Sequence, residues 1–381
     1  MIILKPYRTS FSLSIIGPWI LLVLWLVVQC YIFFHYGVQQ PIDADFYISN
    51  AQAILQGHFP FDRGLWYSSY SCFLALIFWT GGNLTTVVLL QILFSGFATI
   101  ALYKAVANLF KNSTIGFLTT LQYLLWFKIH QWNSYIYTES LFISFSIISF
   151  ALLSLSKEKM HYILTAFMIG FTLFLRPTGI CFFIATCTYL LFKLAQQKHL
   201  SPFKLFITIA STFVILSILL NEMLKEYIFY FIDSYSKSEL IYPNINLGFS
   251  APKQLVIPST THAPLFQLIE FIVYNPIYFL KLFILKFLLF SGNMKPYFSV
   301  AHNILIALVL YPIYAWAVYG FKKMTWSAEN VWMVSFILMQ TLTVSITSEN
   351  WDGRFLILIL PFVFIYAAFG MTNTWNKYRS A

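Results

Sequence analysis

Two carboxylates lie two residues apart in the stretch QPIDADFYISN, at Asp43 and Asp45. In an extended loop, side chains two residues apart face the same side of the chain. Two acids on one side, next to apolar surface, suit a general base or a metal ligand. The alternative is a pair of solvated loop acids that cap the helix after them, because Asp is a favourable N-cap residue.

A third acid, Glu139, occurs in SYIYTES at the start of a segment that is apolar as far as Leu155. Acids within a membrane, or at the mouth of a membrane span, are candidates for function because charge is costly there. Glu139 is therefore a catalytic candidate beside Asp43 and Asp45. The alternative is that Glu139 and Thr138 only cap the helix.

Three basic side chains are candidates for binding a phosphate: Arg176 in FLRPTGI, Arg354 in SENWDGRFLILILP, and Lys286. A guanidinium group binds phosphate through two parallel hydrogen bonds. Each residue also has a structural alternative. Arg176 can anchor a helix end in the membrane interface, Arg354 can pair with an acid that precedes it, and Lys286 can face lipid headgroups.

Tyr47, Tyr67 and His262 are candidates for substrate binding. His262 is the one histidine in a long polar stretch, STTHAPL. No pair of histidines has the spacing of metal ligands on a helix, and no glycine-rich phosphate loop occurs. We expect no cofactor; the acid pair leaves a divalent metal possible, but a metal is not predicted.

The rest of the chain indicates a membrane protein. It has 381 residues, of which 59% are hydrophobic and 9% charged, with a mean hydropathy of +0.74. A soluble domain of this length cannot bury so much apolar surface. The net charge of +10 does not indicate nucleic-acid binding, because the basic residues form short clusters between apolar segments.

A membrane span needs about 20 apolar residues. The clear candidates are residues 12–34, 83–103, 113–127, 137–155, 161–175, 178–194, 203–221, 299–320, 328–347 and 354–371. Two further apolar stretches, 64–80 and 266–290, are ambiguous.

Basic residues in short loops favour the cytoplasmic side. If both ambiguous stretches lie on the outer surface without crossing, the basic residues of the remaining loops and of both termini all lie on one side. They are Lys5, Arg8, Lys104, Lys111, Lys157, Lys159, Lys193, Lys198, Lys204, Lys322, Lys323, Lys377 and Arg379. This arrangement gives about ten spans with both termini inside. Eleven of the 13 acids then lie outside or at outer span ends, which indicates that the outer face carries the function.

We therefore predict an all-α polytopic protein with a single transmembrane domain over residues 1–381. Residues 35–82 form a first outer loop with interfacial helices and the acid pair. Within it, residues 45–56 have helical spacing and Gly57 is a stop signal. Residues 222–298 form a second outer loop with an interfacial helix.

The order of several short motifs resembles the integral-membrane glycosyltransferases of the GT-C superfamily. The motifs are IDADFYISNAQAILQG, WYSSYSCFLALIFW, YTESLFISF, FLRPTGICFF and GRFLILILPFVFIYAAFG. That superfamily includes protein O-mannosyltransferases, the lipid A aminoarabinose transferase and polyprenol-phosphate-mannose-dependent mannosyltransferases. The large soluble domain of some members has no counterpart here, and many relatives carry adjacent acids where Ala44 separates Asp43 from Asp45.

The resemblance implies that a sugar is transferred from a polyprenyl phosphate to a hydroxyl of a lipid, glycan or protein. It implies Asp43 as the catalytic base with Asp45 as its neighbour, and a non-crossing helix over 64–80. Arg176 and Arg354 are the candidates for stabilising the leaving phosphate.

Two other functions remain open from the sequence: a transporter or flippase of lipid-linked glycans, and a non-catalytic subunit of a polysaccharide assembly complex. A transporter is expected to carry ionisable residues within the middle of its spans, whereas the charges here lie at span ends. We expect membrane lipids but no nucleic acid among the partners. The expected location is a bacterial inner membrane, with the active site facing the periplasm or outside.

Overall fold

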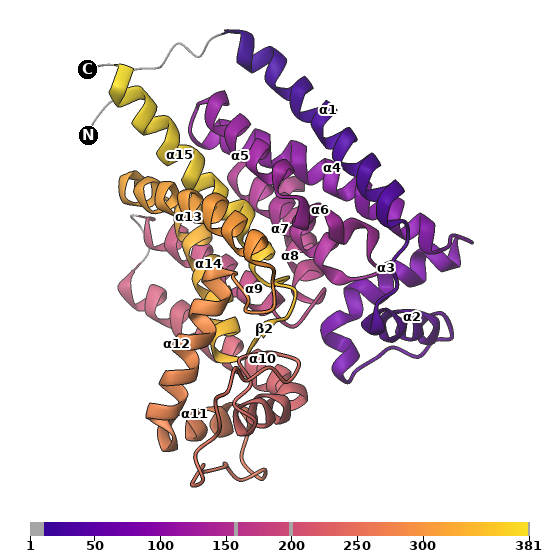
Figure 1. The fold of residues 1–381 in the computed structure, drawn as a ribbon, viewed down its shortest axis with the longest axis vertical. Helices are drawn as coiled ribbons and strands as arrows, with labels where there is room; N and C mark the ends of the chain where they lie inside the picture. The colour runs from indigo at the N-terminus through magenta and orange to yellow at the C-terminus, as the bar shows by residue number, and fades with distance from the viewer. Residues whose placement is uncertain (1–10, 156–158, 198–200, 380–381) are drawn as a thin grey trace. The chain divides into compact units, whose positions relative to one another are not determined.

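The structure, a computed structural model, describes residues 11–155, 159–197 and 201–379. Lys5, Arg8, Lys157 and Lys198, which were used to orient the chain, lie outside the described residues. The described chain forms fifteen α-helices and two strands of two residues each (Figure 1). Together with its long apolar helices, this confirms the predicted all-α polytopic class.

Five described helices are long and apolar enough to cross a membrane: α1 (Phe11–Tyr36, apolar from Ser14), α4 (Leu84–Leu109), α7 (Thr138–Leu155), α10 (Pro202–Ser236) and α13 (Val300–Lys323). A sixth candidate is the pair α11 (Pro264–Tyr274) and α12 (Pro276–Gly292), which are bent by 102° at Asn275. Each of the ten stretches predicted as spans overlaps a helix, but the predicted span 354–371 begins six residues before its helix, α15 (Leu360–Arg379). The number of ten crossings stays a prediction.

The other helices are shorter or more polar. They are α2 (Ile42–Leu55), α3 (Ser68–Trp79), α5 (Ser113–Leu125), α6 (Phe127–Gln131), α8 (Lys159–Leu173), α9 (Gly179–Ala195), α14 (Ala328–Ile346) and α15 (Leu360–Arg379), with 3-10 turns η1 (Arg63–Tyr67), η2 (Trp132–Ser134) and η3 (Leu356–Leu358).

The chain divides into two compact units. The first contains the described residues of Met1–Arg176, Leu310–Thr325 and Leu360–Ala381. In it, α4 packs against α5 and α7, and α5 also contacts α1 and α15 (Figure 1). α4 begins with a capping box, in which Asn83 and Thr86 each accept a hydrogen bond from the other's backbone N–H.

In the same unit, α2 and α3 pack side by side and are joined through η1. Gly57 has a φ of +84° and follows the end of α2 at Leu55. This left-handed conformation costs glycine little, so the predicted stop at Gly57 is confirmed. The helix begins at Ile42, three residues before the predicted start at residue 45.

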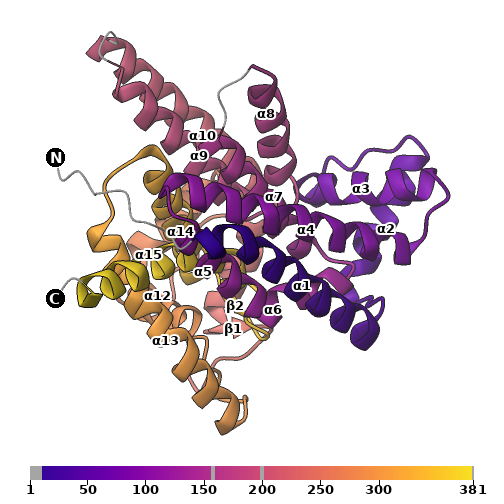
Figure 2. The same ribbon diagram turned by 90° about the horizontal axis from the view of Figure 1, so that it is seen from above.

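The second unit contains Pro177–Val309 and Trp326–Ile359. There α14 packs against α9 and α12, while α10 contacts α9 and α11, as the side-by-side α9 and α10 of Figure 2 illustrate. Strands β1 (Ile241–Tyr242) and β2 (Glu349–Asn350) pair in parallel, with Ile241 opposite Glu349.

Helix α10 is longer than the predicted span 203–221, because it continues to Ser236. Ile228, Phe231 and Tyr235 lie three or four residues apart and are buried in one cluster with Phe271 of α11. Because this spacing places the three side chains on one face of the helix, they pack the extra turns against the core of the second unit. The second outer loop, predicted to begin at residue 222, therefore begins within a helix.

Candidate active site

Asp43 and Asp45 both lie in the first turn of α2. The expectation that they face the same side is wrong, because residues two apart on an α-helix of 3.6 residues per turn point in nearly opposite directions. Asp43 is half-buried and Asp45 is exposed. The cap of α2 is Pro41, with no side-chain cap bond, so the acids do not cap this helix. The two acids thus differ in burial and in the direction of their side chains, which the sequence alone did not indicate.

The Asp43 carboxylate is held by Tyr137, whose hydroxyl donates a hydrogen bond of 2.5 Å to Asp43 Oδ2. Tyr137 is 7% exposed and directly precedes α7. The backbone around both residues is also joined, since Gln39 forms a parallel bridge with Tyr135 and accepts a 3.0 Å bond from Ile136 N. Two segments almost a hundred residues apart in sequence are thereby fixed against one another.

Tyrosine rings surround this contact. The Tyr47 ring centroid lies 5.3 Å from that of Tyr67, 5.2 Å from that of Tyr70 and 5.8 Å from that of Tyr137. Burial raises the pKa of Tyr47 well above its usual range, and the nearby Tyr67, Glu139 and Asp43 raise it further. Tyr47 therefore stays protonated.

Tyr70 anchors this group of rings to α4. Its hydroxyl donates to Gln91 Oε1 at 2.9 Å, and Gln91 Nε2 donates at 2.9 Å to the carbonyls of Asn133 and Tyr135. All of these contacts are within the first unit. Because Gln91 is fully buried, its amide has to be satisfied by protein groups, which fixes the backbone just before Tyr137.

Glu139 and Arg176 form a buried ion pair of 3.1 Å between Oε1 and Nη1, with side chains 2% and 7% exposed. The Arg176 guanidinium also lies 5.6 Å from the centre of the Phe142 ring, a cation–π contact. As predicted, Arg176 lies in a turn after α8. Glu139 and Asp43 both act electrostatically on Tyr47, so the ion pair and the Asp43–Tyr137 contact lie around the same buried ring; these residues are called the acid–tyrosine cluster below.

The other three predicted residues belong to the second unit. The Lys286 ammonium is fully buried, donates to the Thr347 carbonyl, and lies 4.0 Å from the centre of the Tyr235 ring. Arg354 is half-buried in the turn after β2, with its guanidinium 5.5 Å from the Phe355 ring centre.

His262 is exposed, and its Nδ1 lies 2.7 Å from Glu270 Oε2. The pair joins the loop before α11 to that helix itself. Gln267 Nε2 donates a further bond of 2.6 Å to the His262 carbonyl. These contacts make His262 part of the local structure at the start of α11.

Sequence reasoning missed several residues. Tyr137 stands two positions before Glu139 in the same motif, and this proximity was the available signal. Arg63 is exposed beside the aromatic cluster, with its guanidinium 5.4 Å from the Phe46 ring centre. No sequence pattern singles Arg63 out, because only the packing of η1 on α2 brings it there.

A second group that sequence reasoning did not bring together is the buried pair Glu349 and Lys295, in the second unit. Glu349 and Lys295 are 0% and 1% exposed. Burial raises the pKa of Glu349 to about 7, although Lys295 opposes this. Burial also lowers the pKa of Lys295, against the effects of Glu349 and Asp352. The desolvation of both charges is thus greater than their mutual attraction.

Within the described ranges, no three His, Cys, Asp or Glu side chains are grouped so that they could hold a metal ion.

No curated protein matches the chain. Residues 65–220 match a family model described as dolichyl-phosphate-mannose-protein mannosyltransferase. The matched segment runs from η1 into α10 and contains Tyr67, Glu139 and Arg176, while Asp43 precedes it. Over residues 65–220 the chain is thus similar to this family of the GT-C superfamily, which confirms the predicted resemblance and supports a membrane glycosyltransferase of the mannosyltransferase type.

Proposed function

We propose that this protein transfers a sugar from a polyprenyl-phosphate-linked donor to a hydroxyl group of a lipid, glycan or protein acceptor. The match to a family described by its lipid-phosphate-mannose donor supports this donor class and a hexose such as mannose. The observation that carries the proposal is the acid–tyrosine cluster, in which Tyr137 holds Asp43 while Glu139 holds Arg176. It combines a carboxylate for proton removal with a cation for a phosphate.

Asp43 is the proposed general base. In the reaction its carboxylate takes the proton of the acceptor hydroxyl, the oxygen attacks the anomeric carbon, and the bond to the lipid phosphate breaks. The Tyr137 hydroxyl orients the carboxylate through Oδ2. Asp45 points away from this contact and is exposed, so of the two acids Asp43 is better placed.

Arg176 is the proposed partner of the leaving phosphate. Negative charge develops on that phosphate as the bond breaks, and a positioned guanidinium stabilises it. Glu139 is a positioning residue in this proposal, because its carboxylate is engaged with Arg176 Nη1 rather than exposed to substrate. Its pairing supplies a counter-ion to the guanidinium and orients it in a buried setting.

The remaining predicted residues are proposed to bind the substrates. Tyr47 and Tyr67 are proposed to bind the sugar: Tyr67 is half-buried and contacts it directly, while the buried Tyr47 supports the Tyr67 ring, with centroids 5.3 Å apart. Lys286 and Arg354 are proposed as further phosphate contacts, and His262 as a substrate contact. Lys286 and His262 also have structural partners, the Thr347 carbonyl and the Glu270 carboxylate.

The proposed location is the inner membrane of a bacterium, with the reaction on the periplasmic face. The basis is the charge distribution, in which basic loops alternate with acidic span ends. In this location the protein is in contact with membrane lipids and with polyprenyl-phosphate donors. The proposed sugar transfer uses no cofactor.

The test uses membranes of the source cells that carry the wild-type protein, Asp43→Asn or Asp45→Asn, supplied with labelled polyprenyl-phosphate-mannose. Loss of a general base typically lowers the rate about 10²–10⁴-fold, so Asp43→Asn should lose label transfer and release of polyprenyl phosphate. Asp45→Asn is the matched control and should keep both.

Equal activity of Asp43→Asn and wild type would overturn the assignment of the base. A wild-type protein that moves the labelled donor across sealed vesicles without forming product would instead identify a flippase. Unchanged product in membranes that lack the protein altogether would favour a non-catalytic role.

A further inference from the structure

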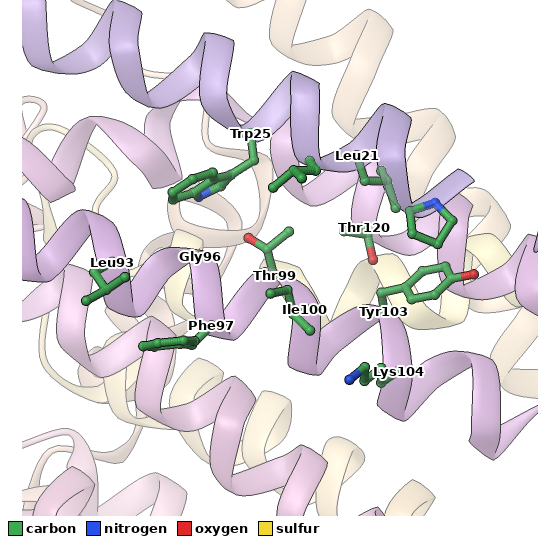
Figure 3. Close-up of a pocket in the computed structure, with 12 residues that line it drawn as sticks. Leu21, Trp25, Leu93, Gly96, Phe97, Thr99, Ile100, Tyr103, Lys104 and Thr120 are labelled. Atoms are coloured by element: carbon green, nitrogen blue, oxygen red, sulfur yellow. The ribbon is translucent and has the colours of Figure 1, made fainter. Parts of the chain in front are cut away.

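A pocket of about 330 Å³ lies in the first unit between α1, α4 and α5. Figure 3 shows Leu21 and Trp25 of α1 above it, facing Thr99 and Tyr103 of α4. None of the residues proposed for sugar transfer lines this pocket. Its lining residues are Pro18, Leu21, Leu22, Trp25, Leu93, Gly96, Phe97, Thr99, Ile100, Tyr103, Lys104 and Thr120.

The walls offer almost nothing polar to a ligand. The Thr99 hydroxyl donates to the Ser95 carbonyl at 2.7 Å, and the Thr120 hydroxyl donates to the Gly116 carbonyl at 2.9 Å. Both hydroxyls are thus used by their own helices. The occupant in this region must be hydrocarbon, because a polar group there would lose its hydrogen bonds.

The pocket is also open to the surroundings of the unit. Leu93, Phe97 and Ile100 on α4 are 46%, 51% and 50% exposed. Both α1 and α4 are long and apolar enough to cross a membrane, so the exposed side of α4 faces lipid in a bilayer. Gly96 gives the pocket its shape: a Cβ at this position would come within 2.9 Å of the Trp25 ring.

One end of the pocket carries a positive charge. Lys104 is exposed, and within the part of the chain that the structure describes its ammonium has no hydrogen bond or ion pair. It lies five residues before the end of α4 at Leu109. Along α4 it is about 20 Å from Gln91, which anchors the acid–tyrosine cluster, at about 1.5 Å per residue.

From these observations we propose that the pocket binds one acyl chain of an anionic phospholipid, with the lipid phosphate on Lys104. The lipid belongs to the leaflet at the C-terminal end of α4, on the side predicted to be cytoplasmic. The charge of Lys104 complements the phosphate, and the apolar walls complement the chain. The volume is at the low end of the range of about 300–1,000 Å³ that ligand pockets occupy, which fits part of one chain but not a whole lipid.

The experiment uses the full-length protein in vesicles of phosphatidylcholine and phosphatidylglycerol, with bromine on the acyl chains of one lipid or the other. Bromine quenches tryptophan fluorescence on contact. Trp25 is the one tryptophan among the lining residues, so the difference between wild type and Trp25→Phe isolates its signal from the other ten of the chain's 11 tryptophans.

We expect half-maximal quenching of Trp25 at a mole fraction of brominated phosphatidylglycerol about fivefold lower than that of brominated phosphatidylcholine. One lysine near an anionic lipid surface contributes about 1 kcal/mol, which corresponds to this preference. Lys104→Ala should abolish this preference. Lys323→Ala, at the C-terminal end of α13, is the matched control and should preserve it. Thr99→Leu, which fills the pocket, should reduce quenching by both lipids.

Equal quenching by the two lipids in wild type, or a preference that survives Lys104→Ala, would overturn the proposal and leave the pocket in contact with bulk lipid only. Unbrominated polyprenyl phosphate is added in a competing arm. If it relieves the quenching at lower amounts than unbrominated phosphatidylglycerol, the pocket belongs to the donor lipid and the proposal fails.

Discussion

At the residue scale, the pairing of Glu139 with Arg176 determines how either side chain can act. Both are buried, and each ion would otherwise be stranded in a setting of low polarity. A single variant that loses activity therefore does not show whether the ion pair serves stability or sugar transfer. A combination of variants does.

We expect Glu139→Gln to lower the free energy of unfolding by about 3–5 kcal/mol, because removal of one partner leaves the other charge buried without its counter-ion. The double variant Glu139→Gln with Arg176→Met should regain much of this stability and remain inactive in sugar transfer. Thermal unfolding in detergent and the transfer assay measure the two effects. Activity in the double variant would show that Arg176 has no role beyond structure.

A second residue-scale feature is Glu349 in the second unit. Its carboxyl group is fully buried, and Lys295, Asp352 and Tyr297 act on it electrostatically. Asn350 N donates to its Oε1 at 2.7 Å. The pKa of about 7 in the folded protein exceeds the value of about 4.3 expected in the unfolded chain.

Between these two pKa values the folded state holds a proton that the unfolded state releases. Stability therefore decreases as the pH rises from about 4.3 to about 7 and stays lower above that. Glu349→Gln should be more stable than wild type at pH 8, by on the order of 3 kcal/mol, and similar to it at pH 4.5. Thermal unfolding at the two pH values measures this, and an equal effect at both would contradict the raised pKa.

At the scale of the elements, α13 and α15 approach one another closely in the first unit. A Cβ on Gly320 would come within 2.1 Å of the Tyr366 carbonyl, and one on Gly370 within 2.2 Å of the Trp316 carbonyl. Small residues at such crossings let helix backbones touch in membrane proteins. The contact depends on both glycines because each faces the backbone of the other helix.

Gly320→Ala and Gly370→Ala should each destabilise the protein by about 1–3 kcal/mol, since the added methyl group has no space. Gly170→Ala on α8 is the control. A Cβ there meets nothing within 4 Å, and replacing a helical glycine adds about 0.5–1 kcal/mol. Midpoints of thermal unfolding compare the three, and equal effects would argue against the close crossing.

The helices themselves were well predicted, because membrane helices are specified locally by apolar length, caps and breaks. All ten predicted spans overlap helices, and Gly57 ends α2 as expected. Their ends were predicted less well. α2 starts three residues early and α10 continues to Ser236, since contacts with other elements stabilise these extra turns.

For the molecule as a whole, the orientation of the chain in the membrane is the prediction on which the outer-face reaction depends. In a variant without the native cysteines, Asp45→Cys should react with a membrane-impermeant maleimide in intact cells. Lys323→Cys should react only after the membrane is opened. Reaction of both from the same side would contradict the orientation derived from the basic residues.

The sequence by itself determined the membrane class, the positions of the helices and the resemblance to GT-C glycosyltransferases, because these depend on composition, local periodicity and the order of motifs. It could not decide between Asp43 and Asp45. Only the tertiary structure gives the two acids different surroundings, because α2 starts at Ile42 and Tyr137 lies against Asp43. Likewise Glu139 and Arg176 were independent candidates until packing joined them. Pairings between residues distant in sequence arise from how helices pack, and no local pattern encodes them.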